Sequence, residues 1–196
     1  HEAAGVVSAV GPETPGVAVG DHVVVTLIRS CGQCFYCSRG DRVMCETVLP
    51  LSERQPITDA SGAPVAQMMN VGSFAEQVLV HHSQIAVMPK DVDFAVASLL
   101  GCGVITGVGA AINTTTISPG ESVVVIGTGG VGLNCIQGAA LSGANPLIAV
   151  DVNDAKLEAA KAFGATHGIN SASQDVAAEV KALTDGRMAD HVLVSV

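Results

Sequence analysis

A glycine-rich turn joins an apolar run to a helical segment, and it constrains the fold of this sequence more than any other feature. The apolar run is Val123–Ile126, the turn is Gly127-Thr-Gly-Gly-Val-Gly132, and a second apolar run ends at Asp151, 24 residues after Gly127. A strand, a GxGxxG turn, a helix and an acidic residue ending the next strand form the context of a dinucleotide-binding site. Without that context the glycine motif would be weak evidence.

The glycines of this turn have separate expected roles. Gly127 permits the tight turn, Gly129 lets the backbone approach a pyrophosphate, and Gly132 lets the helix pack closely on the strand. The helix N-terminus offers unpaired N–H groups to phosphate. Asp151 would bind ribose hydroxyls and repel a 2′-phosphate, which favours NAD over NADP. The alternative is that the glycines serve only turns and packing. The expected cofactor residues are Gly127, Gly129, Gly130, Gly132 and Asp151.

The second half of the chain alternates between strand-like and helix-like segments. Strands are expected over 122–126, 147–150, 167–169 and 191–196, and helices over 130–141, 153–163 and 174–183. Such alternation predicts βαβ units around a parallel sheet. Four strands are fewer than the six of a full doubly wound sheet, so the expected sheet is partial.

The first half has a different character. Short β-like runs over 5–10, 23–28, 75–80 and 85–88 are separated by Gly, Pro and Asp turns, which predicts a mostly-β unit. Residues 94–117 form a long uncharged stretch with four glycines. We expect a buried helical segment there rather than a membrane span. These patterns predict two domains, residues 1–103 and 104–196.

Four of the six cysteines fall in one short segment. Cys31, Cys34, Cys37 and Cys45 are separated by three, three and eight positions. Four thiolates that converge on a tetrahedral zinc leave no position for water or substrate, so the pattern predicts a structural zinc. Two disulfides or an iron–sulfur cluster are the alternatives. Cys135, in the predicted helix after the glycine turn, is expected to pack in the core.

The charge of the chain bears on its partners. Nine Lys and Arg residues against 18 Asp and Glu residues give a formal net charge of −9. That charge would repel nucleic acids and anionic lipid surfaces, so we expect neither as a partner. The residues around the cysteines are also not basic enough for a zinc-ribbon module that binds nucleic acid.

Taken together, the motifs resemble one family, the zinc-containing medium-chain dehydrogenase/reductases, or zinc-dependent alcohol dehydrogenases. The chain carries their motifs in order: a GHE motif reduced to His1-Glu2, the Gly20-Asp21 turn, the four-cysteine lobe, Gly-Ser-Phe-Ala-Glu at 72–76, Gly-Cys-Gly at 101–103 and the GxGGVG turn. The resemblance implies an α/β protein with a partial GroES-like, mostly-β catalytic domain and a partial Rossmann doubly wound parallel sheet.

The resemblance also implies a catalytic zinc bound by His1 and Cys102, with the carboxylate of Glu2 beside it. The zinc would act as a Lewis acid while hydride passes between an alcohol and NAD. The family's remaining cysteine ligand and its proton-relaying hydroxyl stand upstream of the GHE motif. We therefore expect this chain to be a segment that lacks both termini and is inactive alone.

Further roles follow from the same resemblance. Thr106 would lie near the nicotinamide, Val131 behind its ring, and Lys156 near the adenosine ribose. A cytoplasmic homodimer or homotetramer is expected. The substrate would be a primary or aryl alcohol, or a formaldehyde–thiol adduct. Leu49 stands where the glutathione-dependent branch has an Arg, which weakens the glutathione reading.

Two alternatives stay open beside the dehydrogenase. One is a catalytically incompetent, zinc-stabilised nucleotide-binding module. The other is a relative of the zinc-free quinone reductases, which is disfavoured because such a protein would not need the four-cysteine lobe.

Overall fold

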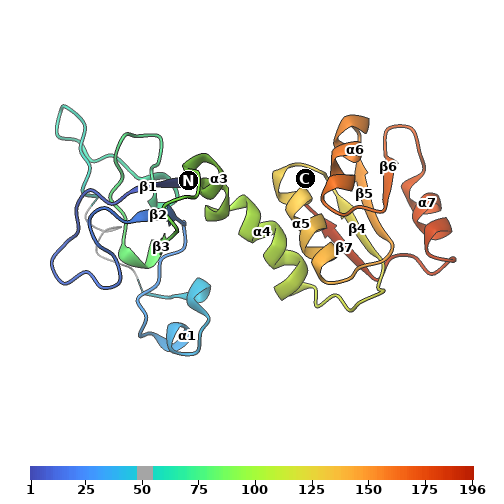
Figure 1. The fold of residues 1–196 in the computed structure, drawn as a ribbon, viewed down its shortest axis with the longest axis horizontal. Coiled ribbons are helices and arrows are strands. Elements are labelled where there is room, and N and C mark those ends of the chain that lie inside the picture. The colour runs from blue at the N-terminus through green and yellow to red at the C-terminus, as the bar shows by residue number, and fades with distance from the viewer. Residues whose placement is uncertain (48–54) are drawn as a thin grey trace. The chain divides into compact units, whose positions relative to one another are not determined.

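The computed structural model describes residues 1–47 and 55–196. The chain forms two compact units, His1–Cys102 and Gly103–Val196. Figure 1 shows the elements of each unit along the chain.

The first unit contains a three-stranded antiparallel sheet with the order β1-β2-β3. Its strands are β1 (Ala3–Val6), β2 (His22–Val25) and β3 (Ile85–Val87). The central strand β2 pairs with both neighbours, and its three valines are buried. β-Branched side chains suit this position because they pack well on a pleated, covered surface.

Short helices complete the first unit. They are α1 (Phe35–Ser38), η1 (Arg42–Met44), η2 (Met68–Asn70), η3 (His82–Gln84), α3 (Phe94–Ser98) and η4 (Leu99–Gly101). The Asp93 carboxylate caps α3 by accepting hydrogen bonds from two backbone N–H groups. The η4 turn lies so close to β2 that a Cβ on Gly101 would be 2.5 Å from the Val25 carbonyl oxygen.

The expected strand over 75–80 is wrong, since this segment is irregular in the structure. None of the described strands forms a ladder with it, and a strand exists only where a neighbour accepts its backbone hydrogen bonds. The first strand also lies earlier than expected, because β1 pairs with β2 only from Ala3 to Val6.

The second unit contains a four-stranded parallel sheet with the order β6-β5-β4-β7. Its strands are β4 (Val123–Ile126), β5 (Leu147–Asp151), β6 (His167–Asn170) and β7 (His191–Val194). The connecting helices are α5 (Gly130–Leu141), α6 (Asp154–Ala162) and α7 (Val176–Leu183). The predicted alternation of strands and helices is confirmed.

Both faces of this sheet are covered. One face packs Val123 and Val125 of β4 in a core with α5 and α6, and the other packs Val124 in a core with Val180 of α7. Alternate residues of one strand therefore enter two cores, as in a doubly wound sheet. Cys135 is 3 % exposed and packs in the first core as expected.

The stretch over 94–117 is helical but broken. After α3 and η4, Cys102 leaves helical geometry, and the chain continues as α4 (Gly103–Gly109) and the π-helix η5 (Ala110–Thr114). In the part of the chain that the structure describes, no single helix is long and apolar enough to cross a membrane. Phe94–Gly101 and Gly103–Thr114 meet that test only as a bent pair.

Candidate metal centre and nucleotide site

The four clustered cysteines converge on one point. Their Sγ atoms all lie within 4.8 Å of one another, with Cys31 to Cys37 and Cys34 to Cys45 each at 4.0 Å. A tetrahedral zinc with bonds of about 2.3 Å places its sulfur ligands roughly 3.8 Å apart. The set therefore fits a single ion with four thiolate ligands.

Local structure gives each sulfur its position. Cys34 precedes α1, Cys37 lies within α1, and Cys45 follows η1. Backbone N–H groups donate to the sulfurs: Cys34 N to Cys31 Sγ at 3.3 Å, and Cys31 N to Cys45 Sγ at 3.4 Å. These bonds favour thiolates, the form that binds a metal.

The structure does not contain the two alternative disulfides. None of the four cysteines is in a disulfide, and 4.0 Å is about twice the length of an S–S bond. Hydrogen bonds from the Thr47 side chain and the Gln33 N–H lower the pKa of Cys31 to about 6, whereas burial raises the pKa of Cys37 to about 11. A cation would ionise Cys37, since metal-bound thiols are deprotonated.

The residues expected at a catalytic zinc lie in the first unit. His1 is half-buried before β1, Glu2 is exposed, and Cys102 follows η4. The η4 turn packs against β1 as well as β2. Within residues 1–47 and 55–196, the four clustered cysteines form the one group of three or more side chains positioned to hold a metal. His1 and Cys102 as zinc ligands stay a prediction.

The glycine-rich turn has the backbone that its sequence predicts. Gly127 has a φ of +91°, a conformation that side chains other than glycine rarely adopt. A Cβ on Gly132 would collide with the Gly127 carbonyl oxygen and lie 2.6 Å from Ser195 Oγ. The chain can therefore turn from β4 into α5 only with glycine at these two positions.

Asp151 at the end of β5 is bound to this turn. Its Oδ2 atom accepts hydrogen bonds from the Thr128 N–H and the Thr128 Oγ1 hydroxyl, both at 2.9 Å, and its Oδ1 atom accepts one from Asn153 N–H at 3.1 Å. The Thr128 N–H bond is the main cause that lowers the pKa of Asp151, and the nearby charge of Lys156 adds to it. The carboxylate is therefore ionised near neutral pH.

Sequence reasoning missed two residues that hold the turn. Thr128 is 2 % exposed and occupies the variable position of the first GxG, so the motif does not specify it. Ser195 follows β7, and its hydroxyl donates to the Gly127 carbonyl oxygen at 2.8 Å. The sequence did contain a signal for the Thr128–Asp151 contact: Thr128 follows β4, and Asp151 ends the next strand.

The first turn of α5 fits a phosphate. Gly129 is the N-cap residue and provides no side-chain hydrogen bond to the helix. Cβ atoms built on Gly129 and Gly130 would meet no described atom within 4 Å. Backbone N–H groups in open space at a helix N-terminus form an anion-binding position.

The other expected cofactor residues lie on three helices of the second unit. Thr106 is exposed on α4, Val131 is half-buried on α5, and Lys156 is exposed on α6. The helices α4 and α5 are in close contact, because a Cβ on Gly107 would collide with the Val131 carbonyl oxygen. Thr106 and Val131 are thus on adjacent helices.

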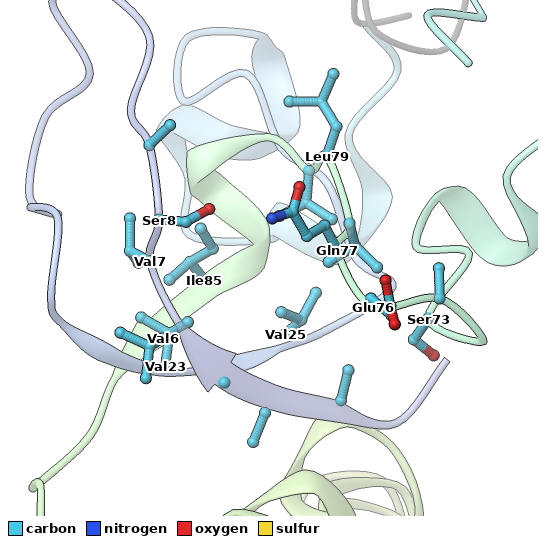
Figure 2. A pocket seen from close by; sticks show the side chains of 17 residues that line it. Val6, Val7, Ser8, Val23, Val25, Ser73, Glu76, Gln77, Leu79 and Ile85 are labelled. Carbon is cyan, nitrogen blue, oxygen red and sulfur yellow. The ribbon is translucent and has the colours of Figure 1, made fainter. Parts of the chain in front are cut away.

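A cavity of about 410 Å³ lies elsewhere, in the first unit. It is bounded by β1 and the irregular 73–80 segment, and Val25 and Ile85 also line it (Figure 2). Figure 2 also shows the polar side chains of Ser73, Glu76 and Gln77 among those that line it. None of the predicted metal or nucleotide residues is among the described residues that line it.

Family models match most of the chain. Residues 1–90 match the alcohol dehydrogenase GroES-like domain, and residues 130–196 match the zinc-binding dehydrogenase model. The expected combination of a partial GroES-like part and a partial Rossmann sheet is confirmed.

Individual relatives agree with these matches. Alcohol dehydrogenase B of Mycobacterium tuberculosis is 40 % identical, over all of this chain and 54 % of its own length. S-(hydroxymethyl)glutathione dehydrogenase of Synechocystis is 37 % identical, over 89 % of this chain and 49 % of its own length. The crystal structure of benzyl alcohol dehydrogenase from Acinetobacter calcoaceticus is 37 % identical with a TM-score of 0.86, over 100 % of this chain and 54 % of that one.

The chain thus spans about half the length of the curated relatives it matches. The chain matches both family models, and its structure contains the four-cysteine cluster and the parallel sheet with its glycine-rich turn. The chain belongs to the zinc-containing alcohol dehydrogenase family of the medium-chain dehydrogenase/reductases.

Proposed function

We propose that the protein to which this chain belongs is a zinc- and NAD-dependent alcohol dehydrogenase, which transfers hydride between a primary or aryl alcohol and NAD. The observation that carries the proposal is the glycine-rich turn, where Thr128 holds an ionised Asp151 beside the open first turn of α5. Because the chain spans about half of its relatives' length, the activity is proposed for the whole protein.

The second unit would bind the dinucleotide. Gly127 and Gly132 permit the tight turn from β4 into α5, and Gly129 and Gly130 leave open space for the pyrophosphate. The N–H groups at the start of α5 would donate to it. Asp151 binds the adenosine ribose with Lys156 nearby, and its charge disfavours the 2′-phosphate of NADP. Thr106 and Val131, on adjacent helices, contact the nicotinamide half in this proposal.

The cysteines and His1 would hold two zinc ions with different roles. Cys31, Cys34, Cys37 and Cys45 bind a structural zinc that fixes the loop between them. His1 and Cys102 contribute two ligands to a catalytic zinc, and Glu2 places a carboxylate next to it. When bound, the catalytic zinc supplies Lewis-acid polarisation of the alcohol oxygen, and NAD supplies the hydride acceptor.

The substrate class rests on the relatives. One is a benzyl alcohol dehydrogenase and another an S-(hydroxymethyl)glutathione dehydrogenase, which supports primary or aryl alcohols first and formaldehyde–thiol adducts second. Leu49, which stands where the glutathione-dependent branch has an Arg, lies outside the described residues.

The test is NADH formation by the whole protein, with zinc content measured on the same sample. The proposal predicts two zinc ions per subunit and NADH formed from benzyl alcohol or a short primary alcohol, with NADP a poorer acceptor. NAD binding without NADH formation from any alcohol or formaldehyde–thiol adduct would support the nucleotide-binding module instead. Full activity that persists after complete removal of zinc would support a relative of the zinc-free quinone reductases.

A further inference from the structure

Thr128 occupies both hydrogen-bond acceptor positions on one oxygen of the Asp151 carboxylate. An ionised carboxylate has two oxygens with about four acceptor positions. The Thr128 N–H and hydroxyl occupy both positions of Oδ2, and Asn153 N–H occupies one position of Oδ1. Within the described residues, the hydrogen bonds of Asp151 leave the second position of Oδ1 for a ligand.

The same contact fixes the direction of the side chain. Two charge-assisted bonds on Oδ2 and one on Oδ1 restrain both torsions of the aspartate, so the free acceptor position has one orientation. Thr128 is 2 % exposed, and its hydroxyl has no water to bond with in place of Asp151. Removing the hydroxyl would leave Asp151 held by the Thr128 and Asn153 N–H groups alone, so that its side chain is less restrained.

We propose that Thr128 is a positioning residue for cofactor choice: it holds Oδ2 of Asp151 so that Oδ1 accepts a hydrogen bond from the adenosine ribose of NAD. The inference rests on the proposed function, because it requires NAD at the glycine-rich turn. It adds a residue that touches Asp151 rather than the cofactor. Discrimination between NAD and NADP then depends on Thr128 as well as on Asp151.

Ser195 provides a matched control, because it supports the turn from a different strand. Its hydroxyl donates to the Gly127 carbonyl oxygen and forms no hydrogen bond with Asp151. Ser195→Ala therefore loosens the turn while leaving the carboxylate in place. Any effect on the pyrophosphate position should weaken NADH and NADPH to the same extent.

The experiment measures the dissociation constants of NADH and NADPH for the protein by the fluorescence of the bound nicotinamide. Thr128→Val keeps the N–H bond but loses the hydroxyl. It should weaken NADH by up to about tenfold, because the less restrained carboxylate makes a poorer hydrogen bond to the ribose, a loss smaller than that of a whole hydrogen bond to a charged group. NADPH should weaken less, so the preference for NADH falls. Thr128→Ser keeps the donor and should restore that preference.

Two further variants complete the design. Thr128→Ala removes the hydroxyl without added bulk and replaces Thr128→Val if circular dichroism shows that the valine variant does not fold. In an Asp151→Ala background, Thr128→Val should cause no additional loss of preference, because the positioned group is absent. Ser195→Ala should leave the NADH-to-NADPH ratio as in the wild type.

The outcomes separate this inference from the proposed function. A wild-type protein that binds neither dinucleotide contradicts the proposed function itself. A wild-type protein that prefers NADH, with Thr128→Val and Thr128→Ala that keep the full preference, overturns the role of Thr128 alone. Equal loss of preference in Ser195→Ala also overturns it, because loop support would then explain the effect.

Discussion

At the scale of single residues, the four clustered cysteines differ in how readily they ionise. Hydrogen bonds, first from the Thr47 side chain, lower the pKa of Cys31 to about 6, while burial raises the pKa of Cys37 to about 11. A buried thiol next to three others is poorly placed to ionise without a cation. Cys37 is thus the ligand that depends most on a bound metal.

Cys37→Ser should remove one zinc ion per chain. A structural zinc draws much of its binding free energy from four thiolates, and a serine hydroxyl is a poor replacement. Cys135→Ala is the control, because Cys135 is buried in the core of the second unit and is not one of the four clustered cysteines. Metal analysis of both purified variants is the measurement, and an unchanged zinc content in Cys37→Ser would rule out the four-cysteine site.

Gly130 and Gly132 are two positions apart and should respond differently to alanine. A Cβ on Gly132 would collide with the Gly127 carbonyl oxygen, so Gly132→Ala should lower the thermal midpoint of unfolding. A Cβ on Gly130 meets open space, and alanine is favoured over glycine in helices by about 1 kcal/mol. Gly130→Ala should therefore fold normally but bind NADH weakly, since its methyl group enters the proposed phosphate position.

Thermal unfolding and NADH titration of the two variants check this pair. Equal stability of Gly132→Ala and the wild type would contradict the close packing at the turn. Undiminished NADH binding by Gly130→Ala would place the pyrophosphate elsewhere.

At the scale of elements, β7 is attached to the start of β4 by polar contacts. Asp190 Oδ2 accepts hydrogen bonds from the Ser122 N–H at 2.8 Å and the Ser122 hydroxyl at 2.6 Å. The Glu121 carboxylate bonds with His191 at 2.8 Å. These contacts hold the start of β7 against the start of β4.

The stability of the second unit should decrease in acid. The Ser122 hydroxyl and N–H lower the pKa of Asp190, so its folded pKa lies below its unfolded value. Its stabilisation is therefore present above the unfolded pKa, about 4, and is lost as the pH falls through the folded pKa. Urea unfolding at neutral pH and near pH 3 measures this change.

Asp190→Asn should flatten that dependence on pH, because an amide does not titrate. Asp185→Asn is the control, since the Asp185 side chain is 89 % exposed and its closest ion pair, with Arg187, is 3.8 Å long. A pH dependence as steep in Asp190→Asn as in the wild type would show that other groups cause the acid loss.

The elements also show how far sequence can lead. The helix over 130–141 was predicted with its observed bounds, because a glycine turn and a Gly-Ala-rich periodic segment are local signals. The prediction of a strand over 75–80 was wrong, because a strand needs a pairing partner that the local sequence does not reveal. The Thr128–Asp151 contact was missed for a similar reason: it depends on β4 and β5 lying side by side.

At the scale of the whole molecule, the predicted metal sites and the predicted nucleotide site belong to different units. The four-cysteine cluster and the predicted zinc ligands His1 and Cys102 belong to the first unit, and the glycine-rich turn with Asp151 belongs to the second. Each unit has its own sheet and its own buried residues. Metal binding by the cluster and dinucleotide binding at the turn should therefore be separable by mutation.

The most direct measurement of the central claim is NADH formation from benzyl alcohol by the whole protein and by its Cys102→Ala variant. Loss of a catalytic zinc ligand should lower the rate by more than about 100-fold, the upper range for residues that only support such ligands. NADH binding and one zinc ion per subunit should remain, because the turn and the four-cysteine cluster are intact. Wild-type rates in Cys102→Ala, or no NADH formation by the unmodified whole protein, would contradict the account.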